Sequence, residues 1–351
     1  MGVAAAKSVA TKKNLTGWRI LQILTWLIGF GIFFCLVFYP SIGVILFWNI
    51  LIPVAPLLIV LAVGVWRNVC PLASVNLLPR HFGFSKGRIM SASTQAKLGL
   101  ISVLLLYFIV PLRHAVFNTN GHATAWLLFG MTITGLIMGT QFEWKSAWCS
   151  TLCPIHPVER LYGNNVLGAV KNAHCAECMN CVLPCPDSTP NMNPRVVKRS
   201  GYASVSGLLI TGGLPGFVWG WFHVPDQHAF NSPMSFLGVY EMPVLGLAVT
   251  LSLYTILLQS KLIKESWLVR IFATAAVSCY YWYRIPSLLG FGIYTGDGML
   301  FDAHGIIAEW IVSLLPVVFT LFFIYFLLIR KPNKKSWLIR PAFAVRSRAA
   351  S

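Results

Sequence analysis

The chain has 351 residues, of which 56% are hydrophobic and 11% are charged, and its mean hydropathy is +0.69. Soluble domains carry about 25% charged residues, so this composition excludes a soluble globular protein and indicates an integral membrane protein. The net charge of +17 is typical of basic cytoplasmic loops in such a protein, and we expect no nucleic-acid partner.

Eight segments are apolar enough to cross a membrane, which takes about 20 residues. In chain order they are residues 18–39, 43–66, 95–117, 123–142, 201–222, 237–258, 266–283 and 305–329. The fifth is interrupted by Gly212, Gly213 and Pro215, and with the seventh it is the least regular. The predicted fold is an all-α integral membrane protein with about eight transmembrane helices and a ferredoxin-like iron–sulfur loop on its cytoplasmic face.

Basic residues collect on the cytoplasmic loops of membrane proteins. With these spans, all 27 Lys and Arg residues except Arg113 and Arg284 fall on one side of the membrane. We therefore expect a multi-pass protein of the bacterial inner membrane, with an uncleaved first helix and both termini cytoplasmic. It divides into a membrane part at residues 1–142, a cytoplasmic segment at 143–200, a second membrane part at 201–330 and a basic tail at 331–351.

The most specific motif is HCAECMNCVLPCP at residues 174–186, which contains Cys175, Cys178, Cys181 and Cys185. This spacing, followed by proline, is that of bacterial ferredoxins that bind a [4Fe–4S] cluster. The first three cysteines share one cluster and the fourth usually serves another, so a remote thiolate is required. Zinc sites favour two CxxC pairs, and a disulfide needs an oxidising compartment, so both are weaker interpretations.

Remote thiolates are present in two other predicted cytoplasmic segments. Cys149 and Cys153 stand in WCSTLCP, and Cys70 stands in WRNVCP. Cys153, which is followed by proline, is the favoured fourth ligand. Cys35 and Cys279 lie inside predicted helices, where we expect them to pack as small hydrophobic residues.

Seven cysteines are then candidate ligands, whereas two [4Fe–4S] clusters would take eight thiolates. Two clusters sharing them would need a ligand such as His156, His174 or a carboxylate, or an open iron. Alternatively, the chain binds one complete cluster and the other cysteines are vestigial, or a partner chain donates the eighth. The sequence leaves these three arrangements open.

The segments WCSTLCP and WRNVCP, together with the ferredoxin run, resemble the membrane-bound polyferredoxin family. Its members serve periplasmic nitrate reductase, nitrous oxide respiration and cytochrome oxidase assembly, and their helix pairs end in Cys-x3-Cys-Pro on the cytoplasmic face. The resemblance covers about residues 18–199. Trp66 stands where a first cysteine is expected, and there is one ferredoxin run where members usually have two.

The resemblance implies electron transfer between a quinone, or another membrane redox partner, and one or two iron–sulfur clusters. The chain would be an electron-transfer component of a respiratory or photosynthetic oxidoreductase complex, with other redox subunits as partners, and not a self-contained enzyme. Two alternatives stay open. One is a non-enzymatic assembly or redox-sensing factor, and the other is a structural membrane anchor with a zinc site or a decayed cluster.

The opposite face carries ionisable groups at or near the predicted spans. Such groups are functional candidates by default, and we predict a quinone site from Glu241, Glu309, His304 and Asp302, where one group would accept a proton from the quinol. The alternative is that these residues belong to the solvated periplasmic surface of the protein and have no specific function. Haem binding by histidines at helix ends, namely His114, His223 and His304, is a weaker interpretation.

Overall fold

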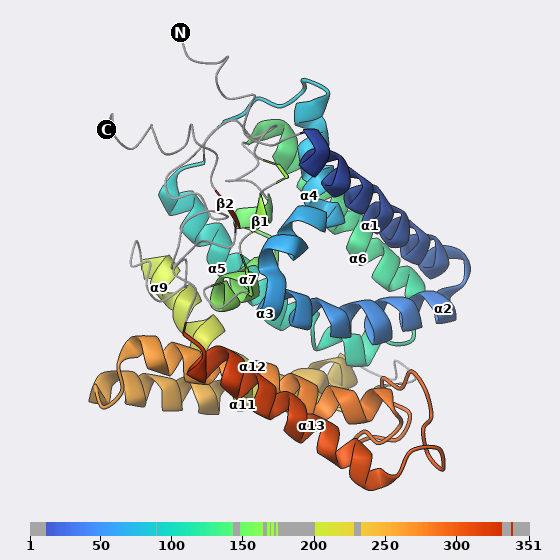
Figure 1. The fold of residues 1–351 in the computed structure, drawn as a ribbon, viewed down its shortest axis with the longest axis vertical. Helices are drawn as coiled ribbons and strands as arrows, with labels where there is room; N and C mark the ends of the chain where they lie inside the picture. The colour runs from blue at the N-terminus through green and yellow to red at the C-terminus, as the bar shows by residue number, and fades with distance from the viewer. Residues whose placement is uncertain are drawn as a thin grey trace.

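The computed structural model describes residues 12–88, 90–142, 148–163, 167–168, 170–171, 173–174, 201–227, 233–331 and 338–339. The described chain is almost entirely helical (Figure 1). The first membrane part contains α1 (Lys12–Phe38), α2 (Pro40–Val44), η2 (Ile45–Leu51), α3 (Ile52–Val69), α4 (Pro71–His81), α5 (Ala92–Ile109), η3 (Arg113–Phe117) and α6 (Gly121–Gln141).

After these come η5 (Trp148–Ser150), α7 (His156–Tyr162), the two-residue strand β1 (Val170–Lys171), α9 (Gly201–Leu208), η6 (Leu209–Gly213), α10 (Leu214–Phe222), α11 (Pro233–Ser260), α12 (Glu265–Leu288), α13 (Glu309–Ile324), η7 (Tyr325–Ile329) and β2 (Leu338–Ile339). The strands pair in parallel, Val170 with Leu338. Figure 1 shows α11, α12 and α13 lying together against the earlier helices, and α1 lying beside α6.

Seven of the described helices are long and apolar enough by composition to cross a membrane, which confirms an all-α, multi-pass membrane protein, and seven of the eight predicted spans meet this criterion. They are Thr16–Phe38, Pro40–His81, Ala92–Ile109, Gly121–Gln141, Gly201–Phe222, Phe236–Ser260 and Glu309–Ile329. The predicted span at residues 266–283 is helical, as part of α12, but it is too polar to count. Its Ala276 and Tyr281 pack in one core with Phe217 of α10 and Phe323 of α13. Protein therefore covers this helix, which explains why it is less apolar than a lipid-facing one.

Contacts between helix ends define two opposite ends of the molecule. At one end, Gln22 and Thr25 of α1 donate hydrogen bonds to the carbonyls of Asn68 and Val69, and Ser102 of α5 donates to the carbonyl of Cys153. We call this the thiol end, because Cys70, Cys149 and Cys153 lie there. The arginine end, at the other end of the run from α2 to α3, contains Arg113, Arg284 and Asn49, the acceptor that both arginines share.

Helices α10 and α11 cross where two glycines meet. A Cβ atom on Gly246 would overlap the backbone oxygen of Gly216, and a Cβ on Gly216 would overlap that of Gly246. Small residues let membrane helices approach this closely, so that packing and hydrogen bonds such as Gly216 N to Thr250 Oγ1 (3.2 Å) hold them together. The two glycines therefore set the position of α11.

We predict that Gly246→Ala destabilises the protein by about 1–3 kcal/mol, because the added methyl group overpacks this crossing. Gly238→Ala, on the same helix, is the matched control, since a Cβ there would have no atom within 4 Å. Thermal unfolding of the purified proteins in detergent measures both. Equal melting temperatures for the two variants would contradict the close approach.

Candidate functional site

Cys70 lies at a break between α3 and α4. It has non-helical backbone angles (φ −57°, ψ 120°) and precedes Pro71, which begins α4. Its N–H still donates to the Trp66 carbonyl, and its own carbonyl accepts from Ala73. The break separates α3 from α4 within the long apolar segment and leaves the Cys70 side chain at their junction.

Cys149 and Cys153 lie on a short irregular segment that packs against the ends of α4 and α6. Cys149 is in the turn η5, and the N–H of Cys153 donates to the carbonyl of Trp148. Trp148 is buried against α6, where a Cβ on Gly135 would lie 3.7 Å from its ring. The Cys-x3-Cys element is therefore held in place by the tryptophan that precedes it.

The structure brings the three predicted thiols Cys70, Cys149 and Cys153 into one apolar cluster, with Leu77 and Met138 among its members. In the sequence, two membrane-spanning helices, α5 and α6, lie between Cys70 and the other two cysteines. Burial, the charge of Glu159 and the two neighbouring thiols hold the pKa of Cys153 well above its usual range. A thiol in this environment stays protonated at neutral pH unless a cation replaces the proton.

One polar group also faces the sulfur atoms. The amide nitrogen of Asn76, a buried residue of α4, lies 3.9 Å from the Cys149 Sγ, within hydrogen-bond range for sulfur. Hydrogen bonds to sulfur are one of the means by which proteins tune iron–sulfur clusters. This hydrogen-bond donor is therefore compatible with a thiolate at Cys149.

A buried ion pair attaches this segment to α3. Arg67 Nη1 lies 2.8 Å from Glu159 Oε2 and 3.0 Å from the carbonyl oxygen of Cys149, and both charged side chains are about 5% exposed. Trp66 Nε1 donates to the other carboxylate oxygen at 2.8 Å, and His156 Nδ1 lies 3.1 Å from Oε2. Burial acts to raise the pKa of Glu159, but the Arg67 charge and these hydrogen bonds outweigh it and lower that pKa.

The chain that leads into the four-cysteine run is also anchored here. Asn68 Oδ1 accepts a hydrogen bond from the Ala173 N–H at 3.0 Å, and His174 Nε2 lies 3.3 Å from the Arg67 carbonyl oxygen. Both Asn68 and His174 are buried. His174, which lies next to α3, is the residue directly before Cys175 in the sequence.

The other predicted ligands, Cys175, Cys178, Cys181 and Cys185, lie outside the described residues. Within the part of the chain that the structure describes, no group of three or more His, Cys, Asp or Glu side chains is arranged to hold a metal ion. Cys35 and Cys279 lie in α1 and α12, within helices as predicted.

Sequence reasoning missed the residues that hold the thiol end together, namely Arg67, Asn68 and Glu159. A signal was present, because an arginine at the end of an apolar span needs a buried partner or water. The sequence does not say which carboxylate supplies the partner, since Glu159 is 92 positions away.

At the arginine end, the structure does not bring the four predicted quinone residues together. Asp302 and His304 form an exposed pair with 2.7 Å between Oδ1 and Nδ1. Glu241 lies on α11 and Glu309 begins α13, and both side chains are exposed. The quinone site at these residues stays a prediction.

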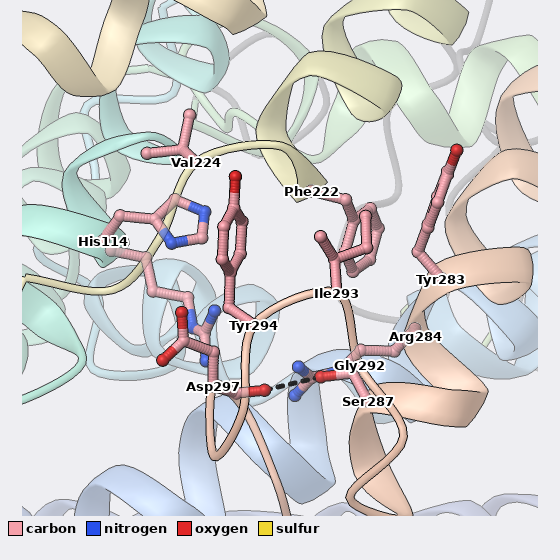
Figure 2. Close-up of a pocket in the computed structure, with 11 residues that line it drawn as sticks. His114, Phe222, Val224, Tyr283, Arg284, Ser287, Gly292, Ile293, Tyr294 and Asp297 are labelled. Carbon is pink, nitrogen blue, oxygen red and sulfur yellow. Dashed lines mark hydrogen bonds between the residues drawn. The ribbon is translucent and has the colours of Figure 1, made fainter.

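A different set of residues at this end, several of them polar, lines a small pocket (Figure 2). Arg113 and Arg284 are 4% and 2% exposed, and both donate to Asn49 Oδ1, at 3.5 and 3.1 Å. Arg113 Nη2 lies 3.7 Å from Asp226 Oδ2, and the Asp226 N–H donates to Asp297 Oδ2 at 2.6 Å. The two exceptions to the predicted charge distribution are therefore buried cations that share the Asn49 side-chain oxygen, and Arg113 also faces the Asp226 carboxylate.

The backbone near Gly298 is shaped to admit this arginine pair. Gly298 has a positive φ of 65°, and a Cβ there would overlap the Arg284 guanidinium and lie 3.2 Å from Arg113 Nη2. Burial of Asp226 acts to raise its pKa, but the hydrogen bond from His114 and the charge of Arg113 outweigh burial, so the pKa is lowered. Asp226 is thus ionised at neutral pH.

Comparisons of this chain with protein-family models, with curated proteins and with solved structures give no match.

We predict that Arg67→Met destabilises the protein by about 3–5 kcal/mol, because it leaves the Glu159 carboxylate buried without its cation. Adding Glu159→Gln should recover part of this loss, since the unpaired charge is then removed. Denaturant unfolding in detergent measures the free energies. Arg88→Met is the control, as the Arg88 side chain is exposed. A loss equal to that of the control would show that the pair does not stabilise the fold.

Proposed function

We propose that this protein is a membrane-integral iron–sulfur protein that transfers electrons at its cytoplasmic face, as a component of a larger redox complex. The observation that carries the proposal is the convergence at the thiol end. Cys70, Cys149 and Cys153 pack in one group of apolar side chains there. The segment that leads into the CxxCxxCxxxCP run is anchored on α3 beside them. Chain segments far apart in sequence thus deliver thiols to one end of the molecule.

The residues proposed to hold the clusters are the four cysteines of the run together with Cys153, Cys149 and Cys70. When bound, a [4Fe–4S] cluster accepts and donates single electrons. The chain's own residues give the thiols an apolar setting, a hydrogen bond from Asn76 to the Cys149 sulfur, and a fixed position through the Arg67–Glu159 pair. Together with the motif resemblance to the membrane-bound polyferredoxins, this arrangement favours a relay over a structural zinc site.

The proposed orientation places the thiol end in the cytoplasm of a bacterial inner-membrane protein, where thiols stay reduced. It is supported by the charge distribution, since 25 of the 27 Lys and Arg residues fall on the side of the cysteine segments by the predicted spans. The two exceptions, Arg113 and Arg284, are buried and hydrogen-bonded at the arginine end. They therefore do not act as exposed topology signals.

We predict that Cys178→Ser lowers the iron and acid-labile sulfide of the anaerobically purified protein by roughly four atoms each per chain, because a [4Fe–4S] cluster is lost. Cys70→Ser should also lose iron if the thiol end contributes a ligand. Cys279→Ser, within α12, is the matched control and should keep the full content. Wild-type protein that contains zinc, or no metal and sulfide, would refute the proposal.

We predict that a reporter fused after Arg199 is cytoplasmic and that one inserted at Gln227 is periplasmic, because the charge bias orients the helices. Fluorescence of a reporter that folds only in the cytoplasm measures both. The fusion after Ser260, the last residue of α11, should match the one at Arg199. The reverse pattern would contradict the proposed orientation. It would not bear on cluster binding, which the iron and sulfide analysis tests separately.

A further inference from the structure

The arginine end contains a histidine–carboxylate pair that the proposed electron transfer does not use. His114 Nδ1 lies 2.5 Å from Asp226 Oδ1, and both side chains are more than nine-tenths buried. His114 is on the π-helical turn η3, and the N–H of Gln227 donates to its carbonyl oxygen at 2.7 Å. The backbone next to Asp226 is therefore fixed to the backbone of His114, which holds the pair in register.

The carboxylate determines which ring nitrogen carries the proton. Asp226 is ionised and can only accept a hydrogen bond, so His114 Nδ1 must be the donor. The neutral ring then presents an unprotonated Nε2. This nitrogen is buried and has no hydrogen-bond partner among the residues that the structure describes. Trp221 packs against the ring, with 5.0 Å between ring centroids, and limits its rotation.

The ring borders a small cavity of about 30 Å³, which is room for one or two water molecules and is lined by both apolar and polar side chains. Figure 2 shows His114 on one side of this cavity and Arg284 with Tyr283 on the other. The Nε atoms of Arg113 and Arg284 are also buried without a partner in the described chain. Buried polar atoms are nearly always hydrogen-bonded, so a cavity of this kind favours an oxygen-containing occupant.

The charges around the cavity are balanced without a further ion, and a proton on the ring is opposed by burial and the Arg113 charge and supported by Asp226. The charged and titratable groups that face or adjoin the ring are Arg113, Arg284, Asp226, Asp297, Tyr283 and Tyr294. Two guanidinium groups are thus balanced by two carboxylates, so a bound anion is not needed for neutrality. One further positive charge on the ring would sit directly against Asp226, where an opposite charge is closest.

We propose that His114, oriented by Asp226, is a proton-binding residue that takes a proton at Nε2 from an O–H donor in the arginine-end cavity. A new N–H bond forms at Nε2, the ring becomes an imidazolium paired with the carboxylate, and the donor is left as its conjugate base. The step is reversible and needs no other reactant. This inference rests on the arginine end alone and stands or falls separately from the iron–sulfur proposal.

The test is hydrogen–deuterium exchange at the C2 carbon of each histidine ring, measured by mass spectrometry of the full-length protein in detergent across pH 3 to 9. The rate rises with pH to a plateau, and its midpoint reports the titration of that one ring. We expect a sigmoidal profile for His114. In Asp226→Asn the midpoint should fall by about one to three pH units, because the imidazolium loses its adjacent negative charge.

His122, which is exposed at the start of α6, is the internal control, and its midpoint should be the same in both proteins. A profile for His114 that is flat with pH in the wild-type protein would overturn the proposal, whether or not the variant folds. A midpoint that is unchanged in a folded Asp226→Asn protein would do so as well.

Discussion

The thiol end depends on one buried ion pair, Arg67 with Glu159. Burying two charges costs several kcal/mol per ion, and mutual attraction repays this only when the remaining hydrogen-bonding positions are also filled. Here they are filled by Trp66, His156 and the Cys149 carbonyl. Each of these partners lies in or beside a cysteine segment, so the pair can be satisfied only when α3 and the Cys-x3-Cys segment are in place. The same requirement that stabilises the pair therefore positions the thiols.

Much of the fold could be predicted from the sequence because lipid imposes a simple constraint. A span must be apolar over its length, so residues such as those from Thr16 to Phe38 can be recognised without knowledge of their neighbours. The predicted span at residues 266–283 is a helix in the structure, but it is less apolar than the others, because its Thr274, Ser278 and Arg284 are buried against other helices. Hydropathy measures contact with lipid, and it loses its meaning for a helix that the protein itself surrounds.

The candidate site was predictable in its chemistry and not in its geometry. The spacing of the cysteine run and the proline after Cys153 point to metal ligands by local pattern alone. Nothing local says that Cys70 joins Cys149, because that contact follows from how α4 packs against α6 and η5. At the arginine end the prediction favoured Glu241 and Glu309, as acidic residues in spans, but both are exposed in the structure. The small pocket is instead formed by residues near helix ends, whose burial depends on tertiary packing.

The two ends are connected by one continuous helical run, from α2 through η2 to α3. Asn49 of η2 shares its side-chain oxygen between Arg113 and Arg284, and Arg67 and Asn68 of α3 hold the cysteine segments. The run departs from helical geometry at Ala62 (φ −147°, ψ 53°), between these two sets of contacts. A shift of α3 at that point would move Arg67 relative to Glu159 without disturbing Asn49. The kink at Ala62 therefore divides α3 into a part that continues from Asn49 and a part that positions Arg67 and Asn68 beside the cysteine segments.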